Sequence, residues 1–324
     1  MQRRTLLQFA GAAAAAQLAL PLRAQQASDK PLRIVTGFAA GGSVDTLARL
    51  IAERCRVSLG RPVIVENKTG ASGRLAVETV KAAPPDGNAV MLVPHGPMTL
   101  FPFIYKSLRF DPAKDFQPIG RVSTSDYCLT TGPQTGSRDI ASFKRAVAQD
   151  GKPASFGTPG AGTVPHFLGI QSAHAMGIPM THVPYRGSVP ALMDLAGGVI
   201  SATVTPLTEP MEMHKAGKIT ILATMGASRT PFLDGIPTFK EQGMDIDISA
   251  WFAMYAPAGT PAAQVQSLNE ALQAALADAD TKEKMFRIGM VPAPSSPAEL
   301  AALQARETKV WGPVVASSGF VPED

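Results

Sequence analysis

Residues 32–45 read LRIVTGFAAGGSVD and carry the sequence from a short apolar run through a glycine-rich loop into a helix. The first five residues predict a strand, and from Val44 onward apolar residues recur at helical spacing until Gly60 ends the pattern. A second strand, a second helix and a third strand are expected at 62–65, 75–83 and 89–93. This β-α-β-α-β order predicts a parallel sheet with right-handed crossovers.

The middle of the chain repeats the pattern. A strand at 154–156 precedes another glycine-rich loop and a helix at 164–176, and further strands are expected at 180–183, 199–204 and 219–224. Near the end, a helix is expected around 265–276, and Ser296, Pro297 and Glu299 form the start signal of a last helix. The repeat predicts an α/β protein with two lobes, made of residues 28–122 plus 227–324 and of residues 123–226. Segment 116–131 is the expected first crossing between them.

Composition and charge narrow the class of protein. The 324 residues are 45% hydrophobic and 17% charged, which excludes an intrinsically disordered chain. The net charge is +4, and residues 1–24 hold three arginines and no acid, so the rest of the chain carries about +1. A near-neutral body lacks the basic surface that nucleic acid requires, and no nucleic-acid partner is expected.

The N-terminus has the three-part layout of an export signal. Two arginines at positions 3 and 4 precede an Ala-rich apolar run, and Ala24 offers a small residue at the expected cut. Residues 1–24 are therefore predicted to be a signal peptide, of either the twin-arginine or the general secretory type. The first cysteine is Cys55, far from the cut, so we expect a protein released into the periplasm without a lipid anchor. Cys55 and Cys128 could pair there or remain buried thiols.

Two strand-to-helix junctions are the candidate ligand-binding loops. Residues 37–45 and 156–166 are both rich in glycine and lead into helices, whose N-termini point free N–H groups at ligands beyond the carboxyl ends of strands. Neither loop has the lysine of a nucleotide-binding P-loop or the dinucleotide spacing. The glycines either form one shared anion site or simply make tight turns. Asp45 and His166 follow these loops, Asp45 as a helix-dipole partner or a contact for a ligand ammonium group.

Catalytic patterns do not stand out. The sequence has no nucleophile elbow and no zinc-protease motif, and its five histidines lack metal-site spacing. His166 has no evident nucleophile to activate. We therefore expect no catalytic residues, no metal and no cofactor, and predict that the protein is not an enzyme. A periplasmic enzyme that uses His166 or Asp45 as acid and base is the alternative from another class.

An ordered set of further motifs completes the sequence pattern. Besides the two loops it comprises residues 65–73 (VENKTGASG), 85–87 (PDG), 110–112 (FDP), 115–116 (DF), 182–187 (HVPYRG), 194–198 (DLAGG), 237–238 (PT), Trp251 and 256–261 (APAGTP). With these motifs in this order, nearly the whole chain after residue 31 resembles the periplasmic substrate-binding proteins of tripartite tricarboxylate transporters, the Bug family.

The resemblance implies a two-lobed periplasmic binding protein of the Venus flytrap, type II-like, kind, with a mostly parallel sheet flanked by helices in each lobe. It implies a ligand carboxylate held between the two glycine-rich loops, largely by backbone amides, hydroxyls and ordered water. The matching positions are Phe38, Ala39, Gly42, Ser43, Asp45, Thr158, Gly160, Gly162, Thr163 and His166.

Further positions concern ligand choice. Tyr185 either lines the cleft or belongs to a surface turn. His95 stands where relatives usually have small residues, and it either contacts the far end of the ligand or faces outward. Thr205 stands where relatives often have an aspartate, which favours a plain mono- or dicarboxylate over an amino acid. Pro159 replaces a common serine and removes one backbone donor.

The resemblance thus predicts a solute-binding protein that captures a small organic anion and delivers it to the large and small membrane subunits of a tripartite carrier. A monomer is expected. The alternative is a periplasmic sensor that presents the bound carboxylate to a signalling receptor.

Overall fold

The strands of the protein form one continuous twisted sheet. The structure is a computed structural model that describes residues 30–322, so the predicted signal peptide at 1–24 lies outside the described residues. Within the described part the sheet has ten strands in the order β2-β1-β3-β9-β4-β7-β5-β6, and β8 and β10 also pair with β4. The strands are β1 (Leu32–Thr36), β2 (Val63–Asn67), β3 (Ala89–Pro94), β4 (Phe116–Thr131), β5 (Ala154–Thr158), β6 (Met180–Pro184), β7 (Ala202–Pro206), β8 (Thr220–Thr224), β9 (Ser249–Pro257) and β10 (Val291–Pro292).

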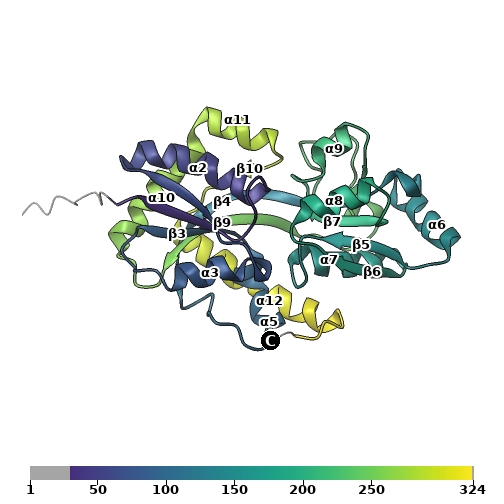
Figure 1. Cartoon of the computed structure of the whole chain (residues 1–324), viewed down its shortest axis with the longest axis horizontal. Helices are drawn as coiled ribbons and strands as arrows, with labels where there is room; N and C mark the ends of the chain where they lie inside the picture. Colours follow the sequence, from purple (N-terminus) through teal and green to yellow (C-terminus); the bar gives the residue numbers. More distant parts are fainter. Residues whose placement is uncertain (1–29, 323–324) are drawn as a thin grey trace, which may run out of the picture.

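The long strand β4 belongs to both halves of the molecule. It pairs antiparallel with β9 up to Asp126 and then, from Tyr127 onward, with β7. On one side β1 pairs in parallel with β2 and β3, and on the other β5 pairs in parallel with β6 and β7. We call these halves lobe 1 and lobe 2, and β4 runs from one into the other (Figure 1). The residue bounds of the lobes stay a prediction.

Helices flank the sheet in both lobes. Figure 1 shows α2 and α11 on one face of the lobe 1 strands and α3 and α12 on the other. The helices are α2 (Ser43–Leu59), α3 (Arg74–Lys81), α4 (Gly96–Thr99), α5 (Phe101–Ile104), α6 (Ile140–Asp150), α7 (Val164–Met176), α8 (Ser188–Ala196), α9 (Met211–Lys215), α10 (Ala262–Ala277), α11 (Ala279–Arg287) and α12 (Pro297–Ser317), with short 3₁₀ turns η1 (Ala71–Gly73), η2 (Pro133–Thr135) and η3 (Lys240–Gln242).

Several local predictions are confirmed in detail. Helix α2 buries Leu47, Ile51 and Cys55 and ends at Gly60, whose φ of 63° suits glycine. Helix α7 has the predicted bounds, and the side chains of Ser296 and Glu299 form a reciprocal capping box at the start of α12. Both cysteines are buried free thiols.

The strand predicted at 199–204 begins later than expected. Residues 199–201 do not belong to β7, because the amide of Val199 still donates to the carbonyl of Asp194 and closes the end of α8. Gly198, with a φ of 77°, makes the turn. The apolar run therefore begins in a helix cap, and only its second part is strand.

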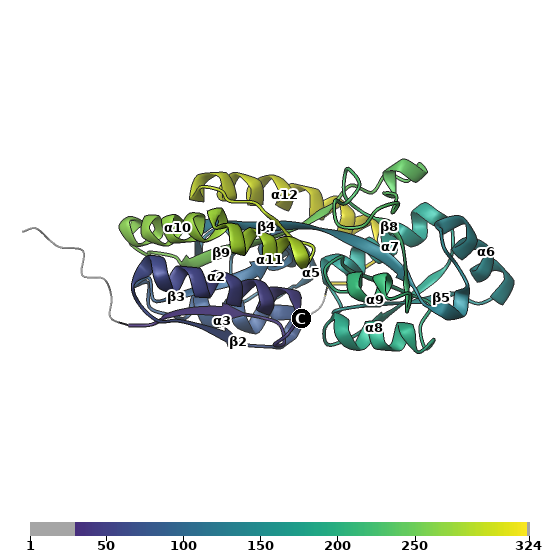
Figure 2. The same ribbon diagram turned by 90° about the horizontal axis from the view of Figure 1, so that it is seen from above.

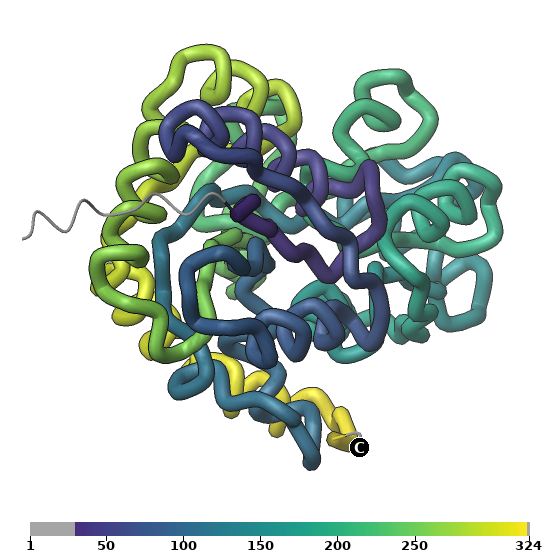
Figure 3. Tube along the Cα trace, turned by 60° about the vertical axis from the view of Figure 1, so that its left-hand side comes forward, coloured from purple at the N-terminus to yellow at the C-terminus, as the bar shows by residue number. Residues whose placement is uncertain are grey.

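The C-terminal helix α12 connects the two lobes. It packs against α4 and α5 in lobe 1, and Figure 3 shows its end beside the segment that carries α5. Beyond the helix, the ring of Phe320 lies 5.3 Å from that of Phe167 on α7 in lobe 2. In Figure 2, α12 lies along β4 on its way toward the second lobe. Both β4 and the C-terminal segment therefore span the junction.

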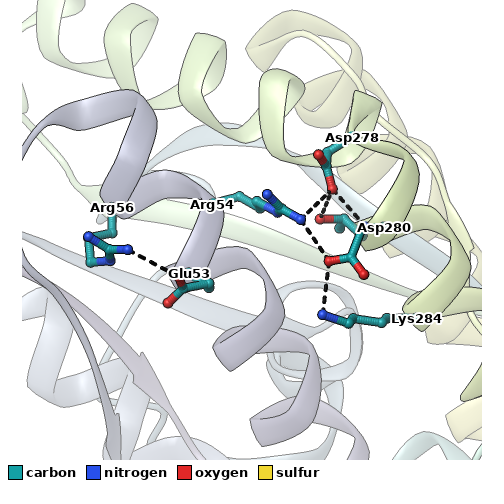
Figure 4. A network of polar contacts seen from close by, with 7 residues as sticks. Glu53, Arg54, Arg56, Asp278, Asp280 and Lys284 are labelled. Atoms are coloured by element: carbon teal, nitrogen blue, oxygen red, sulfur yellow. Dashed lines mark hydrogen bonds and ion pairs between the residues drawn. The ribbon is translucent and has the colours of Figure 1, made fainter.

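Ion pairs fix α11 against α2 on the surface of lobe 1 (Figure 4). Arg54 lies 3.0 Å from Asp278 and 2.7 Å from Asp280, and Lys284 also contacts Asp280 at 2.8 Å. Such exposed pairs contribute little individually, about 0–1 kcal/mol each. No helix within residues 30–322 is both long and apolar enough to cross a membrane.

We predict that replacing Asp126 with Asn stabilises the protein in a pH-dependent manner. Asp126 ends the pairing of β4 with β9, and burial raises its pKa from 3.8 to about 6, although a hydrogen bond from Ser249 opposes this. Ionising this partly buried carboxyl costs stability as the pH rises from the unfolded-state pKa through the folded-state value. Asp126→Asn should therefore raise Tm at pH 8 but not below pH 4.

Thermal unfolding at both pH values measures this effect. The exposed Asp247, which pairs with Lys240, provides the control variant Asp247→Asn, for which we expect no such gain. A gain for Asp126→Asn that is equal at the two pH values would contradict the prediction.

Candidate functional site

A cavity of about 330 Å³ lies where loops from the two lobes meet. Lobe 1 contributes residues of the β1–α2 loop, Ser72 and the turn after β3, and lobe 2 contributes the β5–α7 and β6–α8 loops and residues after β7. These loops follow the carboxyl ends of strands, the usual place for ligands in α/β sheets. The wall is largely apolar, with aromatic side chains from Phe38, Phe101, Tyr127 and Phe252.

Three helices begin at the cavity wall. The N-cap residues are Gly42 for α2, Thr163 for α7 and Gly187 for α8. The two glycines have no side chain to cap their helices, and the hydroxyl of Thr163 does not cap α7. The first backbone N–H groups of a helix lack partners within it, and the helix dipole favours negative charge there. The arrangement therefore suits an anion. The sequence pointed to α2 and α7, whereas the contribution of α8 was not predicted.

Five of the predicted site residues line this cavity. They are Phe38, Ala39, Gly42 and Ser43 of the first loop and Thr163 of the second. The hydroxyl of Thr163 donates to the carbonyl of Gly160 at 2.7 Å and so shapes its own loop. Contact of these five with a ligand stays a prediction.

Asp45 lies behind the first loop instead of lining the cavity. One of its oxygens accepts from the amide of Gly41 and from Arg49, both at 2.9 Å, and the other accepts from Asn67 at 2.9 Å. Burial alone would raise the pKa of Asp45, but hydrogen bonds from Arg49, Gly41 and Asn67 hold it below its usual range. Asp45 is thus a buried, ionised carboxylate that fixes the glycine-rich loop.

The second loop is supported in a similar way. The hydroxyl of Thr158 donates to the carbonyl of Gly160 and contacts Nε2 of His182 at 2.7 Å, and Nδ1 of His166 accepts from the amide of Gly162 at 3.2 Å. The rings of His166 and His182 stack at 3.7 Å. Burial lowers the pKa of His166 to about 4, so its imidazole is neutral at physiological pH and free to accept. None of these four predicted residues lines the cavity.

His95 occupies neither of the two positions considered for it. It is fully buried beside Trp251 and Trp311, with Nε2 3.0 Å from the hydroxyl of Tyr127 and Nδ1 3.2 Å from a carboxylate oxygen of Glu307. It therefore lies neither at the cleft mouth nor on the surface. Instead it supports Tyr127, which does line the cavity.

Tyr185 and Thr205 also lie outside the cavity wall. The hydroxyl of Tyr185 donates to Asp194 at 2.7 Å and joins the strand end to α8. Thr205 is buried in β7, and its hydroxyl has no hydrogen-bond partner among the described residues. Their roles in ligand choice stay predictions.

Two polar residues at the site, Glu209 and Ser72, were not predicted, and a third, Arg186, was expected either to line the cleft or to be exposed in a turn. Glu209, after β7, accepts from the amide of Ser43 at 3.3 Å, and the hydroxyl of Ser72 donates to the carbonyl of Ala161 at 3.0 Å. Both bonds join the lobes beside the cavity. Arg186 lines the cavity and forms no ion pair with any residue in the described range. The motif at 182–187 gave a signal for Arg186, whereas Glu209 lies in a segment with no recognisable pattern.

The site is built for binding. Its polar groups are helix N-termini, a few hydroxyls, one cation and one carboxylate around an apolar space, as in small-molecule sites. Across residues 30–322, no group of three or more His, Cys, Asp or Glu side chains is arranged to hold a metal.

Comparison with solved structures identifies the class. The chain is 30% identical to the periplasmic binding protein BugD, with a TM-score of 0.85 over 90% of this chain and 98% of that one. A protein from R. palustris with adipate matches equally well, at 30% identity, a TM-score of 0.86 and coverage of 91% and 99%. MatC from Rhodopseudomonas palustris with bound malate is 28% identical, with a TM-score of 0.82 and coverage of 88% and 99%. The fold is that of a two-lobed periplasmic binding protein.

A family model that matches most of the chain identifies the family. The model of the tripartite tricarboxylate transporter family receptor matches residues 47–320. The chain therefore belongs to this family, which includes the Bug proteins, and the resemblance found in its motifs is confirmed.

We predict that Gly37→Ala destabilises the first loop. A Cβ at this position would lie 2.6 Å from the Cα of Gly73, and because the obstacle is backbone it cannot rotate away. Overpacking of this kind costs about 1–3 kcal/mol. Urea denaturation should show the loss. Gly42→Ala in the same loop is the matched control, since its Cβ would meet nothing closer than 3.4 Å and its φ is −75°. Equal stabilities of the two variants would refute the prediction.

Proposed function

We propose that this protein is a periplasmic solute-binding protein that captures a small organic carboxylate between its lobes and delivers it to a tripartite tricarboxylate-type membrane carrier. The observation that carries the proposal is that three helices whose N-cap residues provide no capping side chain begin at one cavity, which the unpaired Arg186 also lines. These groups offer hydrogen-bond donors and positive charge without a catalytic partner. The carboxylates named with two of the relatives, adipate and malate, fit this chemistry.

The size and position of the cavity support the same function. About 330 Å³ is at the small end of the range for small-molecule sites, about 300–1,000 Å³. Because its wall comes from both lobes, a ligand that touches both binds the closed arrangement better than an open one. That difference in affinity is what drives closure. In this proposal, export follows the twin-arginine or the general secretory route.

A binding screen of the purified protein tests the proposal. The protein is freed of co-purified ligand by unfolding and refolding, then challenged with mono-, di- and tricarboxylates, aromatic acids and acidic amino acids. A ligand that binds only the folded state raises Tm by mass action. We expect at least one carboxylate to do so, and the absence of any shift in refolded protein would overturn the proposal.

We predict that Ser43→Ala combined with Thr163→Ala weakens binding of that carboxylate. Both residues line the cavity at helix N-termini. Ser43→Ala removes a hydroxyl that can donate to a charged group, and Thr163→Ala removes the bond to Gly160 that shapes the second loop, so we expect a loss of about tenfold in Kd or more. Calorimetric titration measures Kd. Ser296→Ala is the control, because it removes the cap of α12 far from the cavity and should lower stability without changing Kd. Unchanged affinity in a folded double variant would argue against the two-loop site.

The alternative role, a sensor that docks on a signalling receptor, makes a different prediction in cells. Deletion of the genes for the carrier's membrane subunits should abolish uptake of the ligand if the protein serves transport. If it serves signalling, the transcriptional response to the ligand should survive that deletion. Isotope-labelled uptake and transcript measurements in the same strains separate the two roles.

A further inference from the structure

A carboxylate from lobe 2 faces the ligand cavity. Glu209 follows β7, where its amide donates to the carbonyl of Pro206 in a tight turn, and its side chain lines the cavity wall. One oxygen, Oε1, lies 3.3 Å from the backbone nitrogen of Ser43, at the N-terminus of α2 in lobe 1. An acid therefore occupies one of the donors that the helix N-termini present to an anion.

This carboxylate lacks a cationic partner. Glu209 forms no ion pair among the residues described by the structure, and its partners there are the backbone N–H and the side chain of Ser43. Arg186, the other charged side chain of the cavity wall, is not paired with it. Burial raises the pKa of Glu209, although the hydrogen bond from Ser43 opposes this effect. A partly buried carboxylate whose hydrogen bonds come only from a neutral residue keeps an unbalanced negative charge, which a cation would stabilise.

A ligand that carries a cation would both balance this charge and supply donors. An ionised carboxylate only accepts hydrogen bonds, so a second carboxylate beside Glu209 would place two like charges in a space of about 330 Å³. A protonated amine instead donates up to three hydrogen bonds and balances the charge. The ligand carboxylate itself has the three helix N-termini and Arg186.

We propose that Glu209 is a specificity-determining residue that selects carboxylates bearing a protonated amine over their plain counterparts. The proposal rests on the proposed function and names its ligand class. It revises the expectation drawn from Thr205, where the absence of an acid favoured a plain mono- or dicarboxylate. The acid is present after all, four residues later in the chain and inside the cavity.

Matched ligand pairs test the selection. Each pair differs only in an amine: glutamate and glutarate, 2-aminoadipate and adipate, phenylalanine and 3-phenylpropanoate. Calorimetry at neutral pH gives the ratio of Kd values within each pair for the wild type, for Glu209→Gln and for the control Glu212→Gln. Glu212 is exposed, pairs with Lys215 and lies three residues away.

We expect the wild type to bind the amine-bearing member of at least one pair about 10- to 100-fold more tightly than its partner, the effect of a hydrogen bond to a charged group. Glu209→Gln should lose that preference, and Glu212→Gln should keep it. Glu209→Ala, checked by circular dichroism for folding, provides a second neutral variant.

Two other results would overturn the proposal, and they differ in what else they imply. If carboxylates bind but the amine confers no preference, or if Glu209→Gln retains the preference, the role of Glu209 is wrong while the proposed function stands. If no carboxylate of any pair, or of the wider screen, binds refolded wild-type protein, the proposed function fails as well.

Discussion

The pairing of β4 with β9 and then with β7 is the constraint on which the rest of the structure depends. A single strand of sixteen residues is hydrogen-bonded first into lobe 1 and then into lobe 2, with the change of partner between Asp126 and Tyr127. Because a strand is stiff along its length, the loops at the carboxyl ends of β1 and β5 are held facing each other across a narrow gap. Because β4 is paired in both lobes, a change in their relative orientation would bend β4 and displace the C-terminal segment, which also spans the junction. Tyr127, the first residue of β4 to pair with β7, itself lines the gap.

The polar side chains near the cavity have two different roles: some hold the loops in place, and others line the cavity wall. Asp45, Thr158 and His166 use their hydrogen bonds on the backbone of the two glycine-rich loops. The two loops are thereby held in shapes that place the N-termini of α2 and α7 at the cavity wall. A backbone donor carries no side-chain identity, so in the proposed function these two helices would supply general affinity for an anion. Discrimination between anions would then depend on the charged side chains in the wall, Arg186 and Glu209.

The sequence predicts those parts of the fold whose signals are local. Capping residues fixed the start of α12, helical spacing defined α2 and α7, and the crossing segment 116–131 coincides with β4. Strand β9 was missed because it is buried along nearly its whole length, so it lacks the alternation that marks a half-buried strand. The direction of side chains was the second feature that could not be predicted from the sequence. A motif places His95 or Asp45 near the ligand, but only tertiary packing shows that His95 points toward Trp251 and Glu307 and Asp45 toward Asn67. Glu209 reaches Ser43 across 166 positions of sequence, a proximity that no local pattern encodes.

The contacts that join the lobes at the cavity are individually weak, and this has a physical reason. The bond from Ser72 to Ala161 contributes about 1 kcal/mol, and the bond from Ser43 to the carboxylate of Glu209 contributes about twice that when the carboxylate is charged. A strong latch would hold the lobes together whether or not a ligand was present, and ligand binding would then no longer change the shape that a partner recognises. If Glu209 selects amine-bearing ligands as proposed, it makes the closed arrangement conditional in a second way, because its negative charge then has a cationic partner only when such a ligand is bound. The same residue can therefore weaken closure around an empty cavity and strengthen it around a ligand that carries an amine.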